Sequence, residues 1–183
     1  MEEKRQIVTI DGPSGVGKSS VSRIIAAELG YTYLDTGAMY RGVGLYFHNR
    51  GLDVGDESVV APMLRDIHLA LLPAPSVDDD VGVLLNGEDV SEQIRTPELS
   101  MVASKISALP SVRTFLTAMQ RKIAEGGKIV AEGRDMGTVV FPDALHKFFL
   151  EADPEERCRR RLRQLQQKGV EADEKEILEM IVK

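Results

Sequence analysis

Short apolar runs alternate with segments of helical periodicity along this chain. Four runs rich in apolar and β-branched residues predict buried strands: residues 5–10, 31–35, 128–133 and 146–152. After the first run, apolar side chains recur at helical spacing and predict the face by which a helix packs on the core: Val21, Ile24, Ile25 and Leu29. Gly30 stands where such a helix would end. Because strands separated by helices form parallel sheets, the pattern predicts an α/β core.

Further helices are predicted at four places: residues 37–51, 112–124, 153–168 and 173–183. The third has a typical start, with Asp153 as the N-cap and Pro154 in the first turn, and it should stop at Gly169. The fourth is amphipathic.

The region between residues 53 and 112 has a less regular pattern. A helix is predicted before Pro73, and a solvated turn follows it. The Asn-Gly pair at residues 86–87 lies between apolar segments and predicts the tight turn of a β-hairpin. The Thr-Pro pair at residues 96–97 predicts the start of another helix. We therefore expect a small α+β insert in the α/β core.

Composition limits the classes of protein to which the chain can belong. Its 183 residues suffice for one domain with inserted lobes. The formal net charge of −6 argues against a nucleic-acid polymer as partner, since duplex-binding surfaces are basic. No apolar run approaches the roughly 20 residues needed to cross a membrane, and the charged N-terminus lacks a signal-peptide segment. Cys158 has no second cysteine with which to form an intrachain disulfide, and this favours a reducing cytoplasm. We therefore expect a soluble, cytoplasmic protein without membrane contact. We also expect it to be a monomer.

A glycine-rich segment follows the first predicted strand. It reads GPSGVGKS and matches G-x-x-x-x-G-K-[ST] at every position. Glycines let the backbone wrap around a phosphate with several N–H groups pointing inward, and the next helix adds the partial positive charge of its N-terminus. We expect ATP to bind to these residues: Gly12, Pro13, Ser14, Gly15, Val16, Gly17, Lys18, Ser19 and Ser20. Lys18 should reach the β- and γ-phosphates, and the Ser19 hydroxyl should bind the Mg²⁺ that accompanies ATP.

Three other segments hold polar residues that neither a core nor a solvated loop requires. They contribute Asp35, Thr36 and Arg41, then Ser104 and Arg113, and finally Arg134 and Asp135. The first and third segments lie at the ends of predicted strands, and open α/β sheets bind their ligands at the carboxyl ends of strands. A second ligand site is therefore expected there, although the glycine-rich motif does not identify the phosphate acceptor.

Five segments together resemble the bacterial cytidylate kinases, the (d)CMP kinase branch of the nucleoside monophosphate kinases. They are TIDGPSGVGKSS, LDTGAMYR, LNGEDVSEQIRTPE, ASKISALPSVR and GRDMGTVVFPDA. The last of them, with the hairpin insert, is specific to this branch rather than to P-loop proteins in general. The resemblance covers nearly the whole chain. It implies a P-loop NTPase parallel sheet flanked by helices, with an inserted α+β monophosphate-binding lobe and a partial helical lid.

The resemblance also implies roles for individual residues. It places six of them around CMP: Thr36, Arg41, Ser104, Arg113, Arg134 and Asp135. Arg41 and Arg113 would hold the CMP phosphate, since forked guanidiniums match phosphate geometry. Arg134 and Asp135 would contact the base and sugar. From the residues alone, a structural Arg134–Asp135 ion pair and a solvated Arg41 stay open as alternatives.

An arginine-rich helix is predicted after the last strand. Arg157, Arg160 and Arg161 lie along its adjacent turns, and a solvated charged face is the alternative for any one of them. In the family this helix begins a lid over ATP. The resemblance therefore implies that the three arginines, together with Lys18, are catalytic and neutralise charge on the transferring phosphoryl group. A closed lid would also exclude water.

The resemblance divides the chain into three parts. Residues 1–35 and 113–153 would form the P-loop core, residues 36–112 the monophosphate-binding lobe with its hairpin, and residues 154–183 the first part of the lid. The family normally continues with a second lid arm and a last core strand and helix. We expect these to be absent from this chain and its catalysis to be impaired.

The predicted reaction is transfer of the γ-phosphoryl group of ATP to CMP or dCMP. Another small P-loop kinase, acting on UMP, AMP or a small metabolite, is the principal alternative, and the hairpin insert and GRDMGTVVFPDA argue against it. A GTPase would carry an N-K-x-D motif, which the sequence lacks. A module that binds nucleotide without transferring phosphate is the third alternative.

Overall fold

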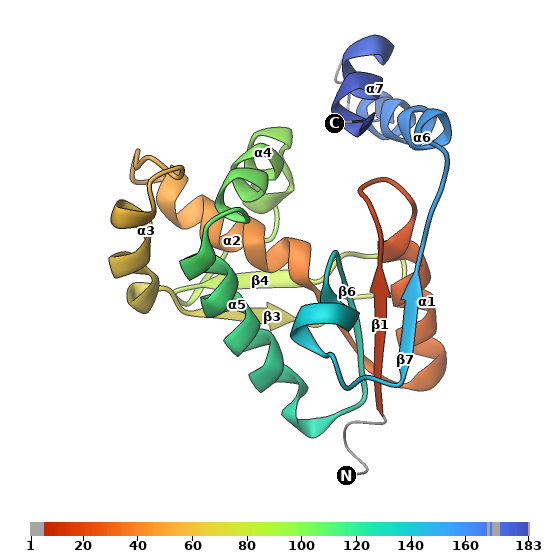
Figure 1. The fold of residues 1–183 in the computed structure, drawn as a ribbon, viewed down its shortest axis with the longest axis horizontal. Helices are drawn as coiled ribbons and strands as arrows, with labels where there is room; N and C mark the ends of the chain where they lie inside the picture. Colours follow the sequence, from red (N-terminus) through yellow and green to blue (C-terminus); the bar gives the residue numbers. More distant parts are fainter. Residues whose placement is uncertain (1–5, 168, 170–172, 183) are drawn as a thin grey trace.

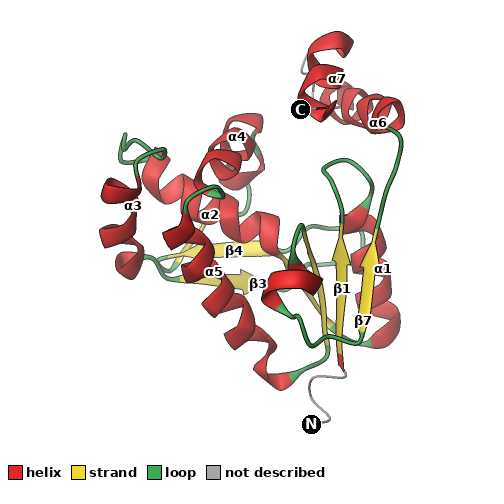
Figure 2. Ribbon diagram, viewed as in Figure 1, coloured by secondary structure: helices red, strands yellow, loops and turns green. Residues whose placement is uncertain are grey.

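The core of the protein is a parallel four-stranded sheet (Figure 1, Figure 2). The computed structural model describes residues 6–167, 169 and 173–182. In sequence order the strands are β1 (Ile7–Asp11), β2 (Thr32–Asp35), β6 (Ile129–Gly133) and β7 (His146–Phe149), and their spatial order is β2-β6-β1-β7. All pairings are parallel. The predicted fold class is confirmed. Arg5, the predicted first residue of a strand, and Lys168, the predicted last residue of a helix, lie outside the described residues.

Helix α1 (Lys18–Leu29) follows β1 and packs on β6, but not by the predicted face. Ser22 and Ala26 are its buried residues, whereas Ile24 is 56% exposed and Val21 and Leu29 are also exposed. The prediction of an apolar packing face was wrong, apart from the half-buried Ile25. Small side chains at the contact let the helix backbone approach the sheet closely, and periodicity of the larger apolar residues does not reveal this.

The inserted lobe is built around α2 (Thr36–His48), which is buried along most of its length. On one side of α2 lies α4 (Pro97–Ile106), and on the other an antiparallel sheet of β3 (Leu69–Leu72), β4 (Gly82–Leu85) and β5 (Glu88–Asp89). A Cβ at Gly42 would stand 2.8 Å from Leu69 Cδ2, and one at Gly44 would stand 3.0 Å from Val102 Cγ1. The two glycines therefore allow close packing on both sides of α2.

The other elements of the lobe match the predicted pattern with one exception. Asn86 and Gly87 have φ values of 51° and 87°, which the tight hairpin turn requires, and the Thr96 side chain caps α4. The segment directly before Pro73 is β3 rather than a helix, because its backbone pairs with β4. Short apolar runs do not distinguish the two structures. The helix of this region is α3 (Glu57–Met63), which leads into a 3₁₀ turn (Leu64–Asp66).

The lobe returns to the core through α5 (Pro110–Ile123), which packs on α3 and α2. Two 3₁₀ turns flank this part of the chain, Gln93–Arg95 before α4 and Ala124–Gly126 after α5. A π-helical turn, η5 (Met136–Val140), follows β6 and appears as the short cyan coil near β1 in Figure 1. The sequence pattern did not predict this turn.

Strand β7 was predicted to be buried, and this was wrong. All four of its residues are exposed, with Phe148 at 54% and Phe149 at 63%. The strand pairs with β1 on one side and forms an edge of the sheet among the described residues. An apolar composition predicts a strand but does not say whether both its faces are covered.

Helices α6 (Pro154–Gln167) and α7 (Glu174–Val182) form a pair near the P-loop end of the sheet (Figure 1). Cys158, Leu165 and Ile177 are buried between them, and Leu162 packs against this cluster. Helix α6 therefore presents an apolar stripe to α7. Within the described ranges, no helix has the length and apolar character needed to span a membrane.

Candidate functional site

The loop between β1 and α1 has the backbone of a phosphate cradle. Gly12, Gly15 and Gly17 have φ values of 149°, 80° and 100°, which residues with a side chain rarely adopt. A Cβ at Gly12 would also overlap the carbonyl oxygen of Leu150. Helix α1 begins at Lys18, so its first N–H groups point toward the loop. The conformation matches the prediction made from the motif.

Lys18 lies over this loop. Its Nζ donates a hydrogen bond to the carbonyl oxygen of Pro13 at 2.8 Å. Burial lowers the pKa of Lys18; the charge of Glu132 opposes this shift, and that of Arg134 adds to it. An amine in this position faces the space that the loop encloses and provides a positive charge for a bound phosphate.

Glu132, at the end of β6, is a site residue that the sequence reasoning missed. Its Oε1 accepts a hydrogen bond from Ser19 Oγ at 2.8 Å, and its buried Oε2 has no hydrogen-bond partner among the described residues. Burial raises the pKa of Glu132 to about 7; the charge of Asp35 adds to the shift, and the nearby Tyr33 hydroxyl, Ser19 and Lys18 oppose it. A carboxylate directly after a buried apolar run, KIVA, was the available signal.

The residues beside the loop fit a magnesium ion. A carboxylate oxygen without a partner and a serine hydroxyl are hard oxygen ligands, the kind that Mg²⁺ prefers. Mg²⁺ is usually held by one or two carboxylates together with substrate phosphates rather than by a full protein cage. Accordingly, the described part of the chain contains no group of three or more His, Cys, Asp or Glu side chains that could hold a metal alone.

Two arginines of α6 reach the loop. Arg157 Nε donates to the carbonyl of Ser14 at 2.8 Å, and Arg160 Nη1 donates to that of Val16 at 3.0 Å. The half-buried Arg161 makes no hydrogen bond to the loop within the described residues. The structure thus brings Arg157 and Arg160 to the P-loop and leaves Arg161 on the same helix without such a contact.

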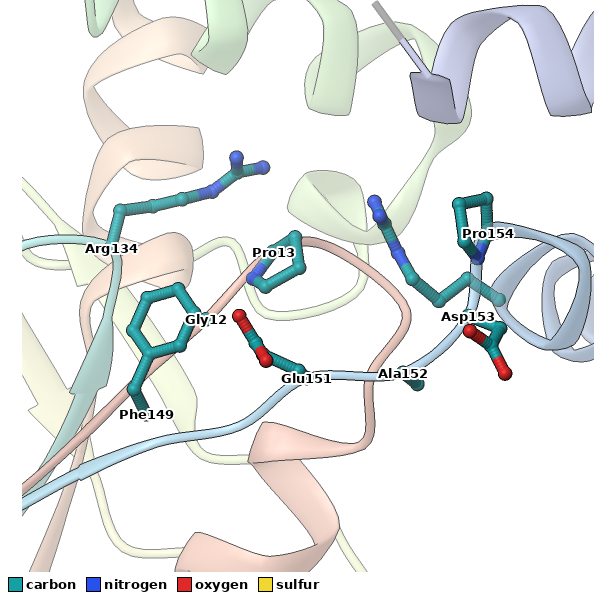
Figure 3. A pocket seen from close by; sticks show the side chains of 9 residues that line it. Gly12, Pro13, Arg134, Phe149, Glu151, Ala152, Asp153 and Pro154 are labelled. Carbon is teal, nitrogen blue, oxygen red and sulfur yellow. The ribbon is translucent and has the colours of Figure 1, made fainter.

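A cavity of about 680 Å³ opens beside the loop (Figure 3). It is lined by the start of the P-loop, by Arg134 after β6 and by the segment from Phe149 to Arg157. Arg134 extends toward the loop at Pro13 in Figure 3, and its positive charge is among the causes that lower the pKa of Lys18. Arg134 therefore lines the same cavity as the start of the P-loop.

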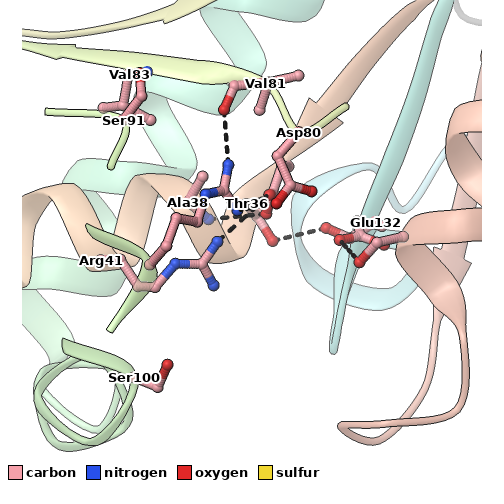
Figure 4. Close-up of polar contacts among 12 residues, drawn as sticks. Thr36, Ala38, Arg41, Asp80, Val81, Val83, Ser91, Ser100 and Glu132 are labelled. Atoms are coloured by element: carbon pink, nitrogen blue, oxygen red, sulfur yellow. Dashed lines mark hydrogen bonds and ion pairs between the residues drawn. The ribbon is translucent and has the colours of Figure 1, made fainter. Parts of the chain in front are cut away.

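A second polar cluster surrounds the buried carboxylate of Asp35, at the end of β2 (Figure 4). This carboxylate accepts a hydrogen bond from the Ala38 N–H and thereby caps α2. Arg41 Nη2 and Arg95 Nη1 each lie 3.5 Å from its Oδ2. The Nε of Arg41 is buried and has no hydrogen-bond partner within the described residues. Arg41 therefore keeps a donor for a further anion.

Arg95 and Asp80 connect this cluster to the core, and neither was a predicted site residue. Arg95 Nη2 donates to the carbonyl of Val81 at 2.7 Å, and its Nη1 lies 3.3 Å from Asp80 Oδ2. The other carboxylate oxygen of Asp80 is 2.7 Å from Nη1 of Arg23 on α1. A chain of alternating charges thus runs from the helix behind the P-loop to Arg41.

Arg113 and Asp135, two of the residues expected around CMP, lie beside each other in the structure. Arg113 Nη2 donates to Asp135 Oδ2, and both side chains keep some exposure to solvent. The half-buried Tyr40 of α2 is close by: burial raises its pKa, and the charges of Arg113 and Asp135 act on it in opposite directions. Three elements, α2, α5 and the turn after β6, therefore converge at this point.

The remaining two predicted residues have different environments. Thr36 is buried, and its hydroxyl donates to the carbonyl of Glu132 at 2.7 Å (Figure 4), so it ties α2 to β6. Ser104 is exposed on α4, and its carbonyl accepts a hydrogen bond from the Ser107 hydroxyl. No hydrogen bond or ion pair joins either residue to the Arg113–Asp135 pair among the described residues.

Comparison with known proteins agrees with this geometry. The family model described as cytidylate kinase matches residues 8–183. A cytidylate kinase of Carboxydothermus hydrogenoformans is 48% identical over 176 residues, which are 96% of this chain and 78% of that protein. One from Syntrophotalea carbinolica is 48% identical over 93% of this chain and 71% of its own length. A bifunctional pantoate ligase/cytidylate kinase of Synechococcus elongatus is 46% identical over 94% of this chain and 33% of its own length.

Proposed function

The chain belongs to the cytidylate kinase family, and from this premise we infer that it transfers the γ-phosphoryl group of ATP to CMP or dCMP, giving ADP and CDP or dCDP. The observation that supports this most directly is the position of the P-loop. Arg157 and Arg160 hydrogen-bond to its carbonyls, and Arg41 lies beside Asp35 at the carboxyl end of β2, at the same edge of the parallel sheet, so that cationic side chains are available there for a donor and an acceptor phosphate.

On the donor side, we propose that the P-loop N–H groups and Lys18 bind the β- and γ-phosphates of ATP. Arg157 and Arg160 already hydrogen-bond to the loop carbonyls. They have further guanidinium donors with which to neutralise the charge that spreads over the transferring group. Arg161, on the same helix, is proposed for this role on the family resemblance alone.

On the acceptor side, Arg41 is proposed to hold the CMP phosphate, since it keeps a buried donor without a partner beside the Asp35 carboxylate. The Arg113–Asp135 pair is proposed to read the base and phosphate, with Asp135 accepting from the cytosine amino group. Thr36 and Ser104 keep their proposed place near CMP through the resemblance. For Arg134 a phosphate is proposed rather than the base or sugar, because Arg134 lines the cavity together with Gly12 and Pro13 of the P-loop.

We propose Mg²⁺ as the cofactor that accompanies ATP, with Ser19 and Glu132 as the residues that hold it. When bound, the ion would supply positive charge that offsets the charge of the ATP phosphates. The residues of this chain do the rest: they hold both nucleotides in line, neutralise developing charge and exclude water. No general base is required for such a transfer, because positioning and electrostatics carry most of it.

The test is the rate of ADP formation from ATP and Mg²⁺ with each of CMP, dCMP, UMP and AMP as acceptor. We expect turnover with CMP and dCMP to exceed that with AMP, because a purine is larger than cytosine and would hold its amino group at a different place relative to Asp135. Equal rates with AMP and CMP would contradict cytosine recognition. Binding of ATP and CMP without ADP formation would contradict the phosphoryl transfer itself.

A further inference from the structure

Asp11, the last residue of β1, joins the phosphate loop to the turn that follows β6. Its Oδ1 accepts a hydrogen bond from the N–H of Met136, and its Oδ2 accepts one from the N–H of Gly137, both at 2.8 Å. The residue is 7% exposed. A buried carboxylate is thus bound at both oxygens by the first two amides of η5.

The P-loop backbone does not depend on this side chain. In the sheet, Asp11 lies between Gly133 of β6 and Phe149 of β7, and its carbonyl oxygen accepts a hydrogen bond from the Leu150 N–H at 2.8 Å. The main chain that enters the loop is therefore held by neighbouring strands. The carboxylate contributes its two hydrogen bonds to η5.

The other end of η5 is held from α5. Arg121 Nε donates to the carbonyl of Val140, and its Nη2 donates to that of Val139, both at 2.9 Å. The turn also has little space in which to move, since a Cβ at Gly137 would stand 2.8 Å from Thr9 Oγ1. π-Helical turns are rare and occur frequently at functional sites. This one is fixed at both ends and packed against β1.

Asp135 lies immediately before this turn and pairs with Arg113 of α5. The position of η5 therefore sets the position of the Arg113–Asp135 pair relative to Gly12, the first residue of the phosphate loop. We propose that Asp11 is a positioning residue that fixes the acceptor-reading pair at the distance from the donor loop that transfer requires. This inference rests on the proposed function of the site.

The test compares Asp11→Asn with the unaltered full chain, using separate calorimetric titrations of CMP and ATP. Asparagine has the same shape, but its amide group would present a donor to one of the two N–H groups. Loss of one charge-assisted hydrogen bond of this kind should raise the Kd for CMP by about tenfold or more. The Kd for ATP should stay within about twofold, because the neighbouring strands hold the main chain that enters the P-loop. Asp56→Asn is the matched control, because Asp56 also accepts a hydrogen bond from a backbone N–H, that of the exposed Ser58. This control should change neither affinity.

Two further measurements keep the outcomes distinct. Amide hydrogen exchange at Met136 and Gly137 should accelerate in Asp11→Asn, whether or not CMP is present. This measurement therefore tests whether Asp11 holds η5 even if CMP is not the acceptor. Arg121→Lys, which removes a bond at the other end of η5, should weaken CMP binding in the same selective way and serves if Asp11→Asn does not fold. Equal loss of ATP and CMP affinity, or unchanged exchange at these amides, would overturn the proposal. Failure of the unaltered chain to bind CMP would instead contradict the proposed function.

Discussion

The donor side and the acceptor side of this site are built from different kinds of contact. The donor loop is one continuous segment, residues 12–19, whose shape depends on glycines with positive φ and on a lysine that bonds back to a carbonyl five residues earlier. The acceptor side is assembled from α2, α5 and the turn after β6. Its contacts join residues far apart in sequence, such as Thr36 with Glu132 and Arg113 with Asp135.

This difference has a consequence for mutation. Changes in the donor loop should lower catalysis directly, because we propose that its backbone and Lys18 bind the phosphates of ATP. Changes on the acceptor side should act through displacement of one element relative to another, so they should alter CMP affinity more than ATP affinity. Four substitutions, from the largest expected effect to the smallest, test this distinction.

Lys18→Met should have the largest effect. Removal of a preorganised cation from the transferring phosphates should lower kcat by about a thousandfold, at the upper end of what loss of one such donor costs. Steady-state rates of ADP formation measure it. Lys147→Met is a matched control, since Lys147 Nζ also donates to a proline carbonyl five residues earlier, that of Pro142. A similar loss of kcat in both variants would contradict a specific role for Lys18.

Arg113→Ala should raise the Kd for CMP by about ten- to a hundredfold, since it removes charged hydrogen bonds worth about 1.5–3 kcal/mol. The Kd for ATP should be nearly unchanged. Titration of each nucleotide provides the measurement, and a double-mutant cycle with Asp135→Ala shows whether the two side chains act as a pair. If the two substitutions have fully additive effects on CMP binding, the ion pair is not part of CMP recognition.

Glu132→Gln should remove the pH dependence of the apparent Mg²⁺ affinity. Because burial raises the pKa of Glu132 to about 7, the carboxyl becomes ionised as the pH rises from 6 to 8, and only the ionised form attracts Mg²⁺. We expect the apparent Mg²⁺ affinity of the unaltered protein, measured by titration of activity, to rise by up to about tenfold over this interval, since one pKa unit corresponds to a factor of ten. In Glu132→Gln the affinity should be low and nearly flat. A parallel rise in the variant would assign the titration to another group.

The raised pKa of Glu132 should also make the free energy of unfolding depend on pH. A carboxyl whose folded pKa lies above its unfolded value of 4.5 binds protons more tightly in the folded state. The free energy of unfolding should therefore fall as the pH rises from about 4.5 to about 7, and this component should be missing in Glu132→Gln. Denaturant unfolding of the two proteins at pH 5 and pH 8 provides the comparison.

Thr96→Ala should have the smallest effect. The Thr96 hydroxyl caps α4 by accepting from the Leu99 N–H at 3.2 Å, and loss of such a cap costs about 1 kcal/mol of stability. Thermal unfolding should show the loss, ATP affinity should not change, and Thr96→Ser should restore the stability. A fall in ATP affinity would mean that the lobe and the donor loop are coupled more tightly than their separate construction suggests.

Much of the fold could be predicted from the sequence, and the misses have physical causes. The core strands, the hairpin turn at Asn86 and Gly87, and the cap at Thr96 depend on local patterns, and the structure confirms them. The prediction of the packing face of α1 was wrong because small residues rather than large ones contact the sheet. The prediction that β7 is buried was wrong because its own residues do not show whether other strands pair with both of its edges.

The candidate site divides in the same way. By itself the sequence determined the P-loop, since its glycines and lysine act over eight neighbouring residues and their backbone angles are a local property. The tertiary structure alone decided that Glu132 meets Ser19, that Asp11 holds the turn Met136–Val140, and that Arg134 lines the same cavity as the start of the P-loop. The first two contacts join residues more than a hundred positions apart. Only the parallel register of β1 and β6 brings the carboxyl ends of their strands together, and no local pattern records that register.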